Sequence, residues 1–238
     1  MLNMAISQPV LQMHHSRSCN FPYCDSWRLS VETNNARSWK NIPSQCLSFI
    51  NNYMAGKQYL SDSNVIASKS LVFAQSLNIA GDGKDVWVFD IDDTLLSTYT
   101  FFQARGFASE PLAALTLEAS SNIDMFNLPA LSESLKFYKK LQKMNFKIVL
   151  LTGRSENLRI RTELNLLEVG YTNWERLILR NSTDEVKTAI EYKSEKRQEL
   201  VDEGYIIHGS SGDQWSDLLG YAVAKRSFKL PNPIYYIA

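Results

Sequence analysis

The feature that most constrains the fold is an alternation of short apolar segments with longer amphipathic ones. The apolar segments are residues 86–89, 147–151, 176–179 and 205–208. The amphipathic segments between and beside them are residues 130–143, 156–169 and 192–203. The first apolar segment, Val86-Trp87-Val88-Phe89, has no polar residue, which is typical of a parallel strand buried on both faces. The order predicts an α/β fold, with a Rossmann-like parallel sheet and helices on both faces.

The rest of the chain is less regular. Two further helices are predicted near Cys46–Met54 and Asn64–Leu77, and residues 97–128 interrupt the alternation as an insert after the first core strand. We expect residues 1–20 to form a disordered tail. We expect residues 21–238 to form the folded domain.

Charge and hydropathy exclude two classes of partner. Lys plus Arg and Asp plus Glu each count 25, and the basic residues form no stripe, which argues against nucleic acid. No apolar run reaches the roughly 20 residues that span a bilayer, so no membrane partner is expected.

The N-terminal residues show no secretory signal. Met1–Met13 lacks the early Lys or Arg with which such a signal begins.

Three cysteines, Cys19, Cys24 and Cys46, lie in the first fifth of the chain. Their spacing matches no zinc motif. The residues alone leave two alternatives, which are reduced thiols or one disulfide with one cysteine left over. Composition favours reduced thiols, as in a cytosolic protein.

Acidic residues follow two of the predicted strands. Because the carboxyl ends of parallel strands meet at one edge of a sheet, Asp90, Asp92, Asp213 and Asp217 should converge there. Four carboxylates in one crevice repel one another unless a cation lies among them. A set of oxygen ligands favours Mg²⁺, which is therefore the predicted cofactor.

The spacing of Asp90 and Asp92 suits phosphoryl transfer. Residues i and i+2 of a strand end project to the same side, so one carboxylate can attack phosphorus while the other transfers protons. Thr152 offers a hydroxyl and Gly153 an unobstructed N–H group to phosphate oxygens. Lys193 is the predicted cation that balances the charge of the transferring group.

These segments resemble a known family. DIDDT, LLTGR, YKSEKR and GSSGDQWSD, in that order, resemble the four motifs of the haloacid dehalogenase (HAD) superfamily. SWRLSVETNN, KQYLSD, TELNLLEVGY and KLPNPIYYI are similar to segments of the plant acid phosphatases and vegetative storage proteins, which are class B-like acid phosphatases. The resemblance covers residues 20–238.

The resemblance implies a role for each site residue. It implies Asp90 as the nucleophile and Asp92 as the general acid and base, with Thr152, Gly153 and Lys193 on the phosphate. The substrate would be a small phosphomonoester. The metal set is implied in the same way: Mg²⁺ would be held by the Asp90 carboxylate, the Asp92 backbone carbonyl and Asp213, with Asp217 as a direct ligand or a partner of one.

The resemblance also implies features outside the catalytic motifs. Residues 97–128 would form a small helical cap over the site, and Cys24 would pair with Cys46 in an oxidising compartment, leaving Cys19 free. Members of the family usually carry a signal peptide and are secreted or vacuolar, whereas we see no secretory signal in Met1–Met13. A homodimer is compatible with the sequence.

Several residues have two interpretations. We expect Asp93 and His208 to be structural, since turn and strand-end positions commonly hold such residues. Arg154 could bind substrate or form a salt bridge on a helix. Phe101, Phe102, Phe107 and Trp215 could line the substrate pocket or pack beneath it.

Two functions follow from these observations. The first is an acid phosphatase that uses Mg²⁺ and an aspartyl-phosphate. The alternative is a storage or defence protein on the same fold with little or no catalysis, because a fold does not fix a function. A storage role needs no nucleophile, so the presence of Asp90 favours the enzyme.

Overall fold

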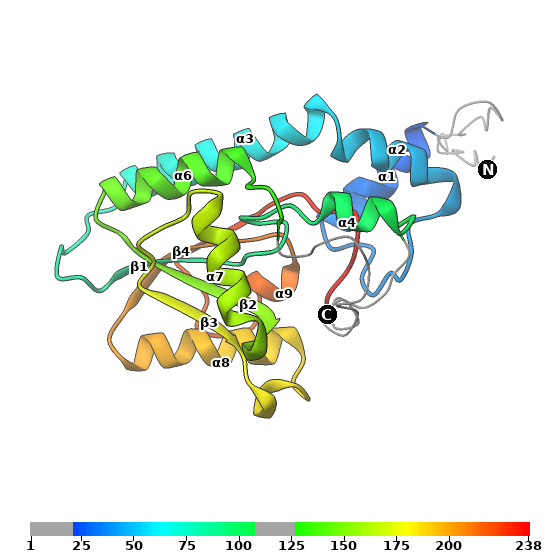
Figure 1. Cartoon of the computed structure of the whole chain (residues 1–238). Coiled ribbons are helices and arrows are strands. Elements are labelled where there is room, and N and C mark those ends of the chain that lie inside the picture. Colours follow the sequence, from blue (N-terminus) through cyan, green and yellow to red (C-terminus); the bar gives the residue numbers. More distant parts are fainter. Residues whose placement is uncertain (1–20, 108–126) are drawn as a thin grey trace, which may run out of the picture.

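A buried strand, β1 (Asp85–Phe89), lies at the centre of a five-stranded parallel sheet (Figure 1). The structure is a computed structural model that describes residues 21–107 and 127–238. The strand order is β3-β2-β1-β4-β5, and every neighbouring pair is parallel. The other strands are β2 (Lys147–Ser155), β3 (Arg176–Arg180), β4 (Ile206–Gly212) and β5 (Arg226–Lys229). The predicted α/β fold is confirmed.

Helices cover both faces of this sheet. The described α-helices are α1 (Phe21–Glu32), α2 (Leu47–Met54), α3 (Lys57–Gln75), α4 (Tyr99–Ala104), α6 (Ser132–Lys143), α7 (Arg159–Glu168), α8 (Ala189–Asp202) and α9 (Trp215–Leu218). In Figure 1, α3 and α6 lie above the sheet and α8 lies below it. None of the described helices is long and apolar enough to cross a membrane.

The side chains of β1 alternate between two cores. Trp87 and Phe89 pack with residues of α6 and α7, whereas Val86 and Val88 pack with Tyr192 and other residues on the α8 side. Successive strand residues point to opposite faces, so a strand covered on both sides must be apolar throughout. This is the physical reason for the unbroken apolar run in the sequence.

Trp87 also determines what its neighbour β4 can contain. A Cβ atom at Gly209 would lie 2.4 Å from the Trp87 ring, so only glycine leaves room for the indole. The indole Nε1 donates a hydrogen bond of 3.0 Å to Ser211 Oγ. β4 continues through residues 209–212, where Gly209, Ser210 and Ser211 pair with β1. The prediction that this strand ends at His208 was wrong.

The other boundaries differ for local reasons. β2 continues through Thr152–Ser155, beyond its predicted end, and α3 begins at Lys57 instead of Asn64. α8 begins three residues before its predicted start because Thr188 caps it. The Thr188 hydroxyl accepts from Glu191 N, and the Glu191 carboxylate accepts from Thr188 N. Positive φ angles at Gly170 and Gly204 confirm both predicted helix ends.

Among the described α-helices and strands, α1, α9 and β5 were not predicted. Only Cys24 and Val31 of α1 are buried, so its sequence carries a weak helical period. α9 and β5 have four residues each, which is too short for a recognisable pattern.

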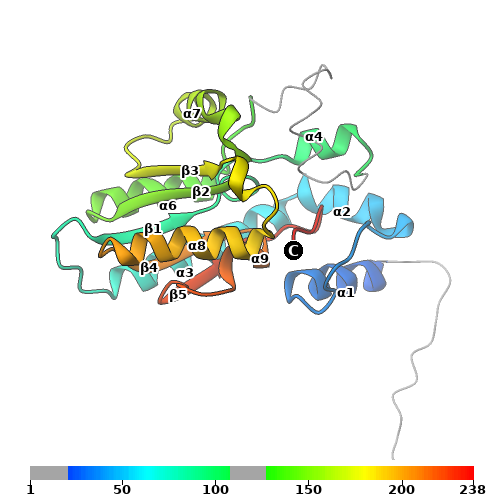
Figure 2. The same cartoon turned by 90° about the horizontal axis from the view of Figure 1, so that it is seen from below.

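The N-terminal helices form a second hydrophobic cluster at one end of the sheet. Figures 1 and 2 both show α1, α2 and α4 gathered there, beside the C-terminal segment. The cluster includes residues of α2 together with Leu230, Ile234 and Tyr235 of that segment. It therefore covers the edge of the sheet at which the parallel strands end.

A disulfide between Cys24 and Cys46 joins α1 to the turn before α2, with the two Cα atoms 5.3 Å apart. The pairing implied by the family resemblance is confirmed. The reduced state favoured by composition is wrong for these two residues. Cys19 lies outside the described residues, as does the predicted tail 1–20.

The insert begins with α4, and its residues 108–126 lie outside the described residues. Phe101 and Phe102 are buried in the second cluster, and the Phe102 ring stacks on Tyr235 at 4.9 Å between centroids. These two side chains pack the protein interior. The cap itself stays a prediction.

Breaking the disulfide should lower the free energy of unfolding by about 3 kcal/mol, because it closes a loop of 22 residues in the unfolded chain. We expect the paired variant Cys24→Ala/Cys46→Ala to show this loss in urea denaturation, in a Cys19→Ser background that excludes disulfide exchange. Equal urea midpoints for the variant and its parent would contradict the prediction.

Candidate active site

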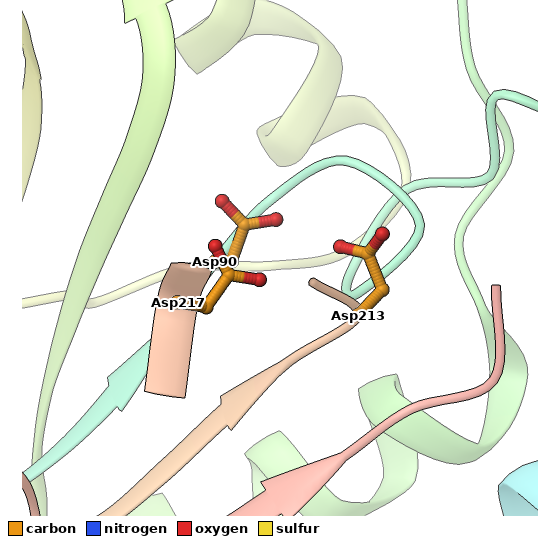
Figure 3. A group of neighbouring side chains, drawn as sticks. All are labelled: Asp90, Asp213 and Asp217. Atoms are coloured by element: carbon orange, nitrogen blue, oxygen red, sulfur yellow. The ribbon is translucent and has the colours of Figure 1, made fainter. Parts of the chain in front are cut away.

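Three carboxylates meet beyond the carboxyl ends of β1 and β4 (Figure 3). Asp90 follows β1 directly, Asp213 follows β4, and Asp217 lies in α9. One carboxylate oxygen of each lies within 4.8 Å of the others, and all three residues are buried. The convergence predicted from the strand ends is confirmed for these three side chains.

A lysine joins two of these carboxylates. Lys193 Nζ, from the first turns of α8, donates to Asp90 Oδ1 and to Asp217 Oδ1, each at 2.5 Å. Burial lowers the pKa of Lys193, but Asp217 and Asp90 outweigh it, and the net pKa lies above the ordinary value. The ammonium therefore keeps its charge.

Asp213 has neutral hydrogen-bond partners. Its Oδ1 accepts from Thr94 Oγ1 at 3.2 Å, and its Oδ2 accepts from Gln214 Nε2 at 2.7 Å and Asn232 Nδ2 at 2.6 Å. Burial, reinforced by Asp217, raises the pKa of Asp213 to about 7. The carboxylate is held by dipoles and lacks a direct cation among these contacts.

Asp90 experiences the same excess of negative charge. Burial raises its pKa well above the usual range; Lys193 opposes this shift, while Asp217, Asp213 and Asp92 add to it. A cation among these carboxylates would offset both the cost of burying their charges and their mutual repulsion. The donor set is made of oxygen atoms, which fits Mg²⁺.

Asp92 lies outside the group of three carboxylates. Its Oδ2 accepts from Arg154 Nε at 2.9 Å, and its Oδ1 accepts from an Arg154 terminal nitrogen at 2.6 Å. Arg154 therefore forms an ion pair inside the site, and the alternative of a salt bridge on the helix face was wrong. Asp92 is not among the three residues whose carboxylate oxygens lie within 4.8 Å of one another, and the metal-binding role of its backbone carbonyl stays a prediction.

Thr152 and Gly153 lie near the carboxyl end of β2, beside the end of β1. Leu150 pairs with Phe89, so Thr152 comes just beyond the register position of Asp90. The Thr152 hydroxyl accepts from Arg154 N at 3.1 Å. A Cβ atom at Gly153 would meet nothing within 4 Å, so space lies next to its backbone. The phosphate-binding role of both residues stays a prediction.

Asp93 and His208 are structural, as predicted. The Asp93 carboxylate accepts from Thr98 N at 2.9 Å and from the Thr98 hydroxyl. His208 Nε2 lies 2.6 Å from Asp85 Oδ1, at the start of β1 and away from the site. Trp215 donates its indole N–H to Glu32 O at 3.1 Å and so connects α9 to α1.

Sequence reasoning missed Gln214 and Asn232, the two amides on Asp213. Gln214 lies within a quoted motif, but nothing in its spacing distinguishes it from a loop residue. Asn232 lies in the C-terminal segment that follows β5, 19 residues beyond Asp213. Its place in KLPNPIYYI was the only available signal.

The chain is similar to known proteins along most of its length. Residues 10–238 match the family model described as HAD superfamily, subfamily IIIB (Acid phosphatase). The chain is 45% identical to "Acid phosphatase 1" of Solanum lycopersicum, covering 90% of this chain and 83% of the relative. It is 36% identical to "Vegetative storage protein 1" of Arabidopsis thaliana, covering 92% of this chain and 81% of the relative.

A solved structure supports the fold. The class C acid phosphatase from Bacillus anthracis with tungstate bound superposes with a TM-score of 0.57 at 19% identity, covering 80% of this chain and 85% of that chain. At this identity the likeness concerns the fold alone.

Because α9 lies close to β4, any side chain at position 212 should destabilise the fold. A Cβ atom there would lie 2.4 Å from the Asp217 side chain, so Gly212→Ala must displace Asp217 or the strand. We expect a loss of about 1–3 kcal/mol in the free energy of unfolding, as for other overpacked cores. Gly153→Ala is the matched control, because its Cβ enters open space. Equal stability of the two variants in chemical denaturation would contradict this packing.

Proposed function

Because this chain belongs to subfamily IIIB of the HAD superfamily, the acid phosphatases, we propose that it hydrolyses small phosphomonoesters through an aspartyl-phosphate on Asp90, with Mg²⁺ as cofactor. The observation that carries the proposal is the setting of Asp90. Its carboxylate stands at the end of the central strand, beside the Lys193 ammonium and two further buried carboxylates. Such a site is suited to a highly charged phosphoryl group.

In the first step, an Asp90 carboxylate oxygen attacks phosphorus and the bond between phosphorus and the ester oxygen breaks. Asp92, which enters this step as the carboxylic acid, gives its proton to that oxygen, so an alcohol leaves and Asp90 carries the phosphoryl group. In the second step, water attacks phosphorus while the Asp92 carboxylate takes one of its protons. The bond between phosphorus and Asp90 breaks, inorganic phosphate leaves and both aspartates return to their starting states.

Positive charge and hydrogen-bond donors hold the transferring group. Lys193 already lies against Asp90 at 2.5 Å, so its ammonium is within reach of oxygens on a phosphorus bound there. The Thr152 hydroxyl and the Gly153 N–H would bind further phosphate oxygens. Because negative charge is spread over the phosphoryl oxygens in the transition state, positioning and positive charge stabilise each of the two steps.

A magnesium ion would be held by the Asp90 and Asp213 carboxylates and the Asp92 carbonyl, with Asp217 as a further ligand or a neighbour of one; the oxygen donors of Asp90, Asp213 and Asp217 support this proposal. When bound, the ion would supply positive charge to the phosphate oxygens as a Lewis acid. On the protein side, Gln214 and Asn232 hold Oδ2 of Asp213. The Thr94 hydroxyl donates to the other oxygen, Oδ1, so the carboxylate is oriented through both of its oxygens.

A storage protein on the same fold is the second candidate, supported by the relatives that are named vegetative storage proteins. Storage needs no nucleophile and no buried charge network. This chain has Asp90 with Lys193 against it, so we favour the enzyme. Storage could accompany catalysis in the same molecule.

Removal of the metal should abolish activity, and added Mg²⁺ should restore it. Loss of outer ligand partners alone commonly weakens metal binding by about 10–100-fold, so Asp213→Asn should weaken Mg²⁺ binding by more than about 100-fold in calorimetry. Its melting temperature should stay near that of the parent, because the variant removes a buried charge. Asp202→Asn, on exposed α8 surface, is the control. Full turnover after exhaustive chelation would exclude the magnesium mechanism.

Replacement of the two aspartates should separate their roles. Asp90→Asn removes the nucleophile and should leave no turnover with any substrate. Asp92→Asn keeps the nucleophile but loses proton transfer, which contributes typically about 10²–10⁴-fold. A substrate with a good leaving group should still phosphorylate Asp90, and the intermediate should accumulate because water activation is slow.

A burst of leaving group and a mass increase on the Asp90 peptide would report that intermediate. The assignment of the nucleophile fails if the added mass appears on another residue, or if Asp90→Asn keeps turnover.

A further inference from the structure

We propose that Arg154 is a positioning residue that holds the Asp92 carboxylate in the orientation its proton transfers require. The inference rests on the proposed function, because it concerns the residue to which that function gives the acid and base role. Arg154 acts through Asp92 and does not itself contact the reacting atoms.

The contact between the two residues has two points. Arg154 Nε donates to Asp92 Oδ2 at 2.9 Å, and a terminal nitrogen donates to Oδ1 at 2.6 Å. Two parallel hydrogen bonds between planar groups fix the rotation of the carboxylate as well as its place. A lysine offers a point charge and cannot fix the carboxylate plane in this way.

Arg154 is itself held from two sides. Its other terminal nitrogen donates to Thr162 Oγ1 of α7 at 3.1 Å, and its backbone N–H donates to Thr152 Oγ1 at 3.1 Å. Arg154, Asp92 and Thr162 are all at most 5% exposed. Three of the five guanidinium N–H groups therefore donate to Asp92 and Thr162, which fixes the position of the guanidinium.

The ion pair between Arg154 and Asp92 matters more for the orientation of the Asp92 carboxylate than for the stability of the fold. A buried ion pair contributes little net stability compared with an apolar pair of the same shape, whereas it does specify one arrangement. Proton transfer is sensitive to that arrangement, because the acid must be within about 2.6–3.2 Å of the oxygen that it protonates. Loss of the two-point contact should therefore harm the steps that use Asp92 and spare those that do not.

Substrates with different leaving groups expose this difference. An alkyl phosphate needs its leaving oxygen protonated, whereas 4-nitrophenyl phosphate hardly does. The ratio kcat/KM reports the phosphorylation step in both cases. We expect Arg154→Lys to lose at least about 10-fold more kcat/KM on ethyl phosphate than on 4-nitrophenyl phosphate, a part of the full effect of proton transfer. The aspartyl-phosphate should also accumulate on the Asp90 peptide, as in Asp92→Asn.

A double-mutant cycle tests whether Arg154 acts through Asp92. In the Asp92→Asn background no carboxylate is left to position, so adding Arg154→Lys should change kcat/KM by less than about 2-fold. Arg159→Lys is the matched control, since Arg159 also pairs with a carboxylate, Glu156, but at the protein surface. It should affect both substrates equally and only slightly.

If Arg154→Lys folds poorly, Thr162→Val provides the same test. It removes only the anchor of one terminal nitrogen and leaves the ion pair in place. Thr162→Val should also lose more kcat/KM on ethyl phosphate than on 4-nitrophenyl phosphate, but the difference should be smaller than for Arg154→Lys. Circular dichroism and the melting temperature would verify that each compared variant is folded.

The outcomes separate this inference from the proposed function. Equal losses on both substrates, no accumulated intermediate and additive effects in the cycle would overturn the positioning role while Asp92→Asn behaves as expected. If Asp92→Asn itself shows no dependence on leaving group and no intermediate, then the proposed roles are wrong and the inference falls with them.

Discussion

The ammonium of Lys193, held between Asp90 and Asp217, is the interaction on which the arrangement of the site depends. Several carboxylates are buried at one edge of the sheet, and burial of charge without a partner is among the largest costs a fold can carry. Lys193 offsets that cost for two of them and Arg154 for a third. Asp213, which neither cation contacts, is held by amides and a hydroxyl. This imbalance is the physical basis for expecting a divalent cation.

The elements around the site serve to place these charges. The Thr188 cap fixes where α8 begins and thereby brings Lys193 to the strand ends in its second turn. The N-terminal helices and the C-terminal segment close the same edge. Glu32 at the end of α1 accepts from Lys229 at 2.9 Å, and Asn232 reaches Asp213 three residues later. The disulfide joins α1 to the residues just before α2, so it holds the N-terminal elements to one another.

The sequence predicted what depends on burial and strand order, and it missed what depends on tertiary contact. Val86–Phe89 was recognised because a strand covered on both faces has no polar positions, and the carboxylates followed from where parallel strands end. The end of β4 was predicted too early, at His208, because the glycine at position 209, which leaves room for the Trp87 ring, interrupts the apolar pattern. The contacts of Arg154 with Asp92 and of Asn232 with Asp213 could not be predicted. Each joins residues that are far apart in the sequence, and the helical and strand periods relate only near neighbours. The pairing of Cys24 with Cys46 came from family resemblance, whereas composition pointed the other way.

The central claim is that Asp90 receives the phosphoryl group at a site where cationic charge is concentrated. A crystal structure with Mg²⁺ and orthovanadate tests it most directly, because vanadate adopts the five-coordinate form of a transferring phosphoryl group. The account predicts vanadium bonded to an Asp90 carboxylate oxygen, Lys193 Nζ on a vanadate oxygen and the metal between Asp90 and Asp213. Vanadium bonded to a different side chain, or bound with no protein oxygen in line, would contradict it.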